Sequence, residues 1–80
     1  MPYYRYFWID ENENHVADHG ISREEFEEVV GDPESVEDSR SSDRFVARGM
    51  TSTGRYLCCV YELFDDGMTV YPVTAYDIDE

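Results

Sequence analysis

The stretch that decides the fold is residues 55–76, RYLCCVYELFDDGMTVYPVTAY. Two runs within it, 55–64 and 68–76, are rich in β-branched and aromatic residues and flank an Asp-Gly dipeptide. This pattern is typical of two strands joined by a tight type I′ turn. The stretch therefore predicts an antiparallel hairpin.

A third run, 44–50 (RFVARGM), precedes this hairpin and is separated from it by the tetrapeptide 51–54, TSTG. The glycine and the small polar residues of the tetrapeptide are typical of a turn. The run therefore predicts a further antiparallel strand joined to the first hairpin.

Two helices are predicted before these strands. Asp10 followed three residues later by Glu13 resembles a capping box, and Gly20 is typical of a helix end. Ser22 and Glu25 form the S-x-x-E capping box of a second helix. Both helices are short.

The order of these elements predicts one α+β domain over residues 1–80. Residues 3–8, YYRYFW, predict a first strand, and the polar residues 34–43 predict a loop or a frayed edge strand. We expect the two N-terminal helices to pack on one face of a three- or four-stranded antiparallel sheet.

The turns also predict which side chains share a face of the sheet. A four-residue loop places Met50 opposite Arg55, and a two-residue loop places Asp65 opposite Met68. The predicted core face carries Phe45, Ala47, Tyr56, Cys58, Val60, Phe64, Tyr71, Val73 and Ala75, with Glu62 as its only charge. The predicted opposite face carries Arg44, Arg48, Arg55, Leu57, Cys59, Tyr61, Pro72, Thr74 and Tyr76.

Charge is unevenly distributed along the chain. The net charge is −13, from nineteen acidic residues and six arginines, with no lysine. Four of the arginines lie within residues 40–55, where Asp43 is the only acid. The overall excess discourages nonspecific contact with nucleic acid, or it reflects adaptation to a salt-rich cytoplasm. The arginine-rich segment predicts a positive surface within a negative protein.

Several classes of protein do not fit the sequence. Cys58 and Cys59 are neighbours in a predicted strand, so we expect two reduced, buried thiols rather than a disulfide. The spacing of histidines and cysteines fits no zinc site, and no cofactor is expected. No apolar run is long enough to span a membrane, and the N-terminus lacks the layout of a signal peptide. We therefore expect a cytoplasmic protein.

Six short motifs follow one another along the chain. They are Trp8-Ile9-Asp10, His19-Gly20-Ile21-Ser22, residues 26–33 (FEEVVGDP), residues 44–49 (RFVARG), Gly54-Arg55-Tyr56-Leu57 and Val73-Thr74-Ala75-Tyr76. Their order resembles the BrnT family of toxins from bacterial toxin–antitoxin pairs, whose fold resembles that of the RelE ribonucleases. Asp18 and Tyr76 stand where that family has a basic residue and an arginine, and the basic tail frequent in the family is absent.

The resemblance implies a metal-independent endoribonuclease that is neutralised by an antitoxin, which we expect to be basic. Such an enzyme must deprotonate a ribose hydroxyl, stabilise charge on the phosphorane and protonate the leaving oxygen. Arg48 and Arg55 are the candidates for stabilising the phosphate charge, and Tyr76 for donating a proton or stacking on a base. Arg44 and Tyr61 are candidates for contacting the RNA substrate.

Two alternatives stay open. His19 lies at the end of the first helix, where a role in fixing the turn is favoured over a catalytic one. The arginines are equally able to pair with the many carboxylates of the chain, and a mixed arginine–tyrosine surface also suits a protein interface. The alternative function is therefore a non-catalytic acidic binding module that engages a basic protein. The oligomeric state is left open by the sequence.

Overall fold

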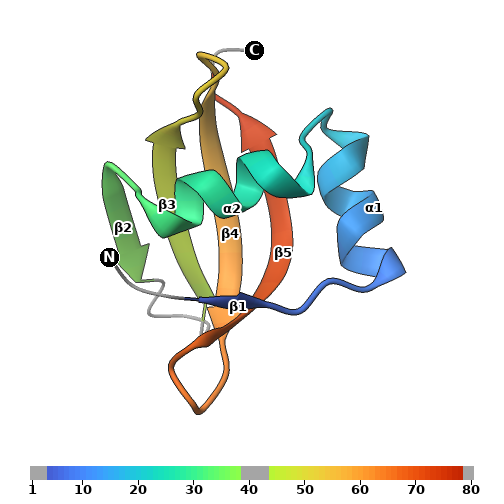
Figure 1. The fold of residues 1–80 in the computed structure, drawn as a ribbon, viewed down its shortest axis with the longest axis vertical. Helices are drawn as coiled ribbons and strands as arrows, with labels where there is room; N and C mark the ends of the chain where they lie inside the picture. Colours follow the sequence, from blue (N-terminus) through green and yellow to red (C-terminus); the bar gives the residue numbers. More distant parts are fainter. Residues whose placement is uncertain (1–3, 39–43, 79–80) are drawn as a thin grey trace.

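The computed structural model describes residues 4–38 and 44–78. In this part of the chain there are five strands and two helices, arranged as Figure 1 shows. Their bounds are β1 Arg5–Tyr6, α1 Asp10–Asp18, α2 Arg23–Gly31, β2 Ser35–Asp38, β3 Arg44–Met50, β4 Tyr56–Leu63 and β5 Thr69–Asp77. Arg40 and Asp43, both in the arginine-rich segment, lie outside the described residues, as does Tyr3 of the predicted first strand.

The sheet is mixed, and within residues 4–38 and 44–78 its five strands follow the order β1-β5-β4-β3-β2. The prediction of a RelE-like antiparallel sheet with three or four strands is therefore wrong. β1 adds to β5 as a parallel strand at one edge, where Arg5 pairs with Thr69 and Tyr6 with Val70. β2 pairs with β3 at the other edge. A two-residue strand is too short for its sequence pattern to reveal its direction.

α2 begins with the predicted capping box. The Ser22 hydroxyl accepts a hydrogen bond from the Glu25 amide at 3.1 Å, and Glu25 Oε1 accepts one from the Ser22 amide at 3.1 Å. The two bonds satisfy backbone donors that the first turn of a helix leaves free. Phe26, Val29 and Val30 then form the buried stripe of this helix.

α1 begins at Asp10, but the predicted cap of Asp10 and Glu13 is wrong. The N-cap is Ile9, whose amide donates to Asn12 Oδ1 at 2.8 Å. Asn12 Nδ2 donates in turn to the Phe7 carbonyl at 2.8 Å. This buried asparagine joins the start of the helix to the end of β1, and it takes the place that a glutamate has in a capping box.

α2 lies over one face of the sheet, and α1 stands at the β5 side of the same core. α2 crosses β3 and β4, and α1 packs beside β5 (Figure 1). The core between them consists of Val16, Ile21, Phe26, Val29, Val30, Ala47, Leu57, Cys59, Tyr61, Val70 and Ala75. No helix of the described ranges is long and apolar enough to cross a membrane.

The β3–β4 hairpin is shifted by one residue from its predicted register, because Met50 pairs with Tyr56 and not with Arg55. Gly54 has a φ of 87°, and the Thr51 amide donates to the Arg55 carbonyl at 2.8 Å. A glycine in this left-handed conformation is typical of a bulge that adds one residue to the connection. A one-residue shift exchanges the faces of a strand, so the predicted facing of β4 is wrong. Its helix-side residues are Leu57, Cys59 and Tyr61, and its open-side residues are Tyr56, Cys58 and Val60.

The β4–β5 connection is longer than the predicted two-residue turn. The last β4 pair is Leu63 with Val70, so the predicted pair of Asp65 and Met68 does not form. Asp66 Oδ1 accepts hydrogen bonds from the Met68 and Thr69 amides, both at 2.8 Å. The Phe64 amide also donates to the Thr69 carbonyl at 2.9 Å, so a backbone bond and the Asp66 carboxylate together close the loop.

A bulge at Val60–Tyr61 changes the β4–β5 register partway along the strands. Tyr61 pairs with Pro72 as predicted, but beyond the bulge Leu57 pairs with Asp77 and not with Tyr76. Proline has no amide hydrogen to donate to a ladder, and it is found in sheets at edges and bulges. The bulge keeps Ala75 in the core and leaves Tyr76 exposed.

Both cysteines are free and buried, as predicted. The register places Cys59 under the helices and Cys58 on the opposite face of the sheet. Burial raises the pKa of the Cys59 thiol far above its usual value. The Cys59 thiolate, which is the reactive form of a cysteine, is therefore disfavoured.

Candidate functional site

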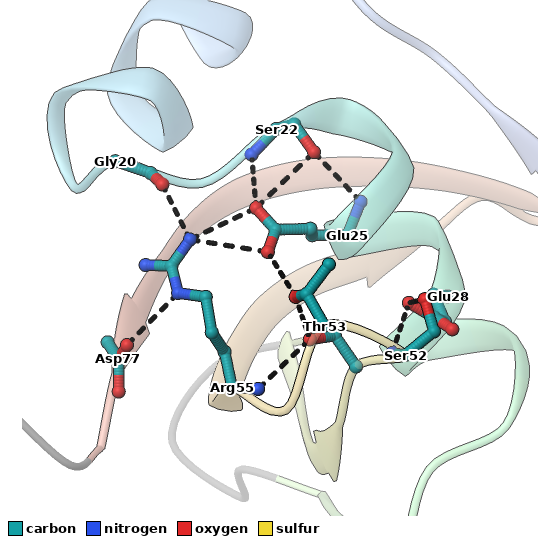
Figure 2. Close-up of polar contacts among 9 residues, drawn as sticks. Gly20, Ser22, Glu25, Glu28, Ser52, Thr53, Arg55 and Asp77 are labelled. Atoms are coloured by element: carbon teal, nitrogen blue, oxygen red, sulfur yellow. Dashed lines mark hydrogen bonds and ion pairs between the residues drawn. The ribbon is translucent and has the colours of Figure 1, made fainter.

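Arg55 lies just before β4 and reaches the helix-bearing side of the sheet (Figure 2). Its Nη1 donates to the Gly20 carbonyl at 2.7 Å and to Glu25 Oε1 at 3.1 Å. Its Nε donates to Asp77 Oδ2 at 3.2 Å. One guanidinium thus joins the turn between the helices, the first turn of α2 and the end of β5.

Glu25 is the carboxylate at the centre of this cluster. Its Oε2 accepts a hydrogen bond from the Thr53 hydroxyl at 3.2 Å, and its side chain is only 16% exposed. Burial raises the pKa of Glu25, but the Ser22 amide, the charge of Arg55 and the Thr53 hydroxyl together outweigh burial. The pKa of Glu25 therefore lies below the usual value, and the carboxylate is charged at neutral pH.

Arg48 lies on the open face of the sheet, across from Cys58. Its Nη1 donates to Glu37 Oε1 of the neighbouring strand at 2.8 Å. Tyr76 pairs with Cys58 from the other side, and its hydrogen bond with Cys58 raises the pKa of Tyr76. The charge of Arg48 acts in the opposite direction on that phenol. Arg48 and Tyr76 therefore flank one buried thiol.

The structure divides the sequence-predicted site between the two faces of the sheet. Arg48, Arg44 and Tyr76 lie on the open face, whereas Arg55 lies on the helix side. Tyr61 is part of the core beneath the helices, and burial raises its pKa to about 12. The prediction that these groups share one surface is wrong, because the bulge after β3 exchanged the faces of β4.

His19 is the C-cap of α1 and is exposed. Its amide donates to the Val16 carbonyl at 3.2 Å, whereas its imidazole makes no hydrogen bond to any described residue. The turn that follows is held by Arg55, through the Gly20 carbonyl. Backbone hydrogen bonds, that of His19 among them, and the Arg55 side chain therefore hold this turn together, and a role for the imidazole stays a prediction.

A cleft of about 340 Å³ lies where α1 meets β3, β4 and β5. Its charged and titratable lining consists of Glu11, His15, Arg44, Glu62 and Tyr71. Arg44, Glu62 and Tyr71 come from adjacent strands and share the open face, because Glu62 pairs with both of the others. The Arg44 and Glu62 side chains face each other at 3.8 Å, measured from Nε to Oε2.

Sequence reasoning included only Arg44 of this group among the site residues. Glu11 and His15 are four residues apart, which places them on one face of a helix. This spacing is the signal that could have selected them. The predicted faces put Glu62 and Tyr71 in the core, and this is wrong, because the register places them with Arg44 on the open face.

The cleft combines two carboxylates, an imidazole, a guanidinium and a phenol. Such groups can accept and donate protons, or they can hold a charged side chain of a ligand. Across the described parts of the chain, no three His, Cys, Asp or Glu side chains are grouped so as to hold a metal ion.

The resemblance to the BrnT family rests on the six short sequence motifs. Because the structure separates the residues that the resemblance marks as catalytic, their roles stay predictions. Comparisons with protein family models, with curated proteins and with solved structures found no match to this chain.

Proposed function

We propose that this protein is a non-catalytic acidic binding module that engages a basic protein partner. One observation carries the proposal: of the five arginines in the described residues, Arg23, Arg44, Arg48 and Arg55 each pair with a carboxylate. The positive segment expected from the sequence is therefore largely neutralised within the fold. The charge left for a partner is the acidic excess.

The open face supports the proposal. Arg48 donates to Glu37 at 2.8 Å on this face, so a phosphate would have to displace that carboxylate from the guanidinium. A protein of net charge −13 also repels nucleic acid at long range, whereas it attracts a basic protein and speeds their encounter. A cognate antitoxin of basic character would be one such partner.

Titration calorimetry of the purified chain with a short arginine–glycine peptide tests the proposal. We expect saturable one-to-one binding that weakens steeply as salt is raised, because screening removes the attraction. A neutral peptide with citrulline in place of arginine is the control. Absence of binding to the arginine peptide at low salt, or turnover of RNA by the purified chain, would overturn the proposal.

A second candidate is the BrnT-like toxin, a ribonuclease held by an antitoxin. The observation that favours it is the presence of His15, Glu62 and Arg44 in one cleft, because metal-independent RNA cleavage needs a base, an acid and a cation. Expression of the chain alone should then slow growth, and His15→Ala should relieve the inhibition. If the arginines expected from the sequence to stabilise the phosphate charge are catalytic, Arg48→Ala or Arg55→Ala relieves it instead. A wild-type chain that neither slows growth nor cleaves RNA is not a ribonuclease.

A further inference from the structure

We propose that the cleft between α1 and the open face receives an arginine or lysine side chain of the basic partner. The inference rests on the proposed function and names the site at which that function is carried out. It depends on three features of the cleft, which are its available carboxylates, its aromatic and apolar wall, and the weak ion pair that it already contains.

The carboxylates of the cleft are available to a ligand. Glu62 has only Arg44 as an ion-pair partner among the described residues, and at 3.8 Å this contact is too long for a hydrogen bond. The Glu62 side chain is 40% exposed. Glu11, from the first turn of α1, forms neither a hydrogen bond nor an ion pair with any residue that the structure describes. Two carboxylates therefore line one cavity with most of their hydrogen-bonding capacity unused.

The wall of the cleft suits the rest of a cationic side chain. Pro72 and Val73 supply apolar surface for its methylene groups, and Tyr71 supplies a ring on which a cation can stack. Tyr71 is held in place by Phe7 and Phe64, whose ring centroids lie 6.0 and 6.4 Å from its own. Side chains that combine a charged head with an apolar stem match this wall, whereas small inorganic cations leave it uncovered.

Arg44 shows that a guanidinium already approaches this site from within the chain. Its side chain is 49% exposed, and its contact with Glu62 is the longest of the arginine–carboxylate ion pairs among the described residues. An exposed pair of this kind contributes little to stability and exchanges readily. A guanidinium from the partner can therefore take the place of Arg44 beside Glu62 at small cost.

An anionic ligand fits the cleft less well. Arg44 is its one permanently charged cation within the described residues, and the two glutamates oppose an anion at the same site. The two kinds of ligand respond in opposite ways to the loss of Arg44. A variant without this cation should bind a basic peptide more tightly, because a competitor of the incoming guanidinium is gone, whereas it should bind RNA more weakly.

The test uses the full chain and two fluorescent probes, the arginine–glycine peptide and a short single-stranded RNA. Glu62→Gln and Glu11→Gln should each weaken peptide binding about fivefold, and Arg44→Gln should strengthen it about twofold to threefold. Glu24→Gln is the matched control, because Glu24 is exposed on α2, lies outside the cleft and removes the same unit of charge. Circular dichroism and thermal melting of each variant establish that it is folded.

The outcomes separate this proposal from the one on which it rests. Peptide binding by the wild type, with Glu62→Gln and Glu11→Gln weakening it no more than Glu24→Gln, overturns the cleft and leaves the acidic module standing. Absence of peptide binding by the wild type overturns both proposals. RNA binding that Arg44→Gln abolishes overturns the cleft as a site for cations and favours the ribonuclease.

Discussion

Both faces of the sheet carry arginines that pair with carboxylates, but these arginines have different roles on the two faces. On the covered face, the guanidinium of Arg55 binds a carbonyl and two carboxylates, and its side chain is 30% exposed. On the open face, Arg48 and Arg44 each pair with one glutamate that is largely in contact with water. The comparison shows that an arginine near a predicted site can be part of the fold, and that its partners decide which role it has.

The largest expected effect tests the difference in packing between the faces. Phe26 of α2 is completely buried against the sheet, so Phe26→Ala should lower the free energy of unfolding by about 3–5 kcal/mol. Phe64→Ala is the matched change at an exposed ring, and this substitution should lower the free energy of unfolding by about 1 kcal/mol. Urea denaturation measures both. Equal losses would show that the open face is also covered in solution.

The second prediction compares the thermal stability of variants that lack one arginine from either face. Arg55→Ala removes hydrogen bonds that join the helix turn, α2 and β5, so we expect a clear drop in the thermal midpoint. Arg48→Ala removes one exposed pair, and we expect almost no change. Differential scanning calorimetry under one buffer condition measures the two variants. A reversed order would mean that Arg55 is free to bind a ligand.

A smaller effect concerns acid stability. The pKa of Glu25 is lower in the folded chain than in the unfolded chain, so its contribution is complete above the unfolded value and is lost as the pH falls through the folded one. Stability should therefore begin to decline below about pH 4.5. Glu25→Gln should flatten this part of the stability–pH curve measured by urea denaturation at each pH. An unchanged curve would exclude Glu25 as the source.

The smallest effect is a difference in the rate at which a thiol reagent labels the two cysteines. Both are buried, but Cys59 lies under the helices while Cys58 is covered on the open face by side chains such as Arg48 and Tyr76. Side chains at a surface move more easily than a packed helix, so Cys58 should react first with a thiol reagent in the native state. Mass spectrometry of the partly labelled protein identifies the site. Faster labelling of Cys59 would contradict the assignment of the faces.

The sequence was a good guide wherever one local signal was enough. The Ser22–Glu25 capping box and the Tyr61–Pro72 pair are both present. It was a poor guide where the backbone conformation of one residue decides the facing of side chains far along the strand. The left-handed Gly54 adds one residue to the β3–β4 connection, and Tyr61 therefore lies in the core and not on the open face. The cleft could not be predicted for the same reason, because its residues come from elements whose contacts follow from that register.

The parallel pairing of β1 has a consequence for how the chain is made. Arg5 and Tyr6 pair with Thr69 and Val70, so the first strand has no partner until the last strand has been synthesised. A ribosome releases the N-terminal end first, so the β1–β5 pair can form only after residues 69–70 have emerged. Contacts so far apart in sequence also slow folding. Tyr6 and its neighbour in β1 therefore have no strand to pair with until Val70 has been synthesised.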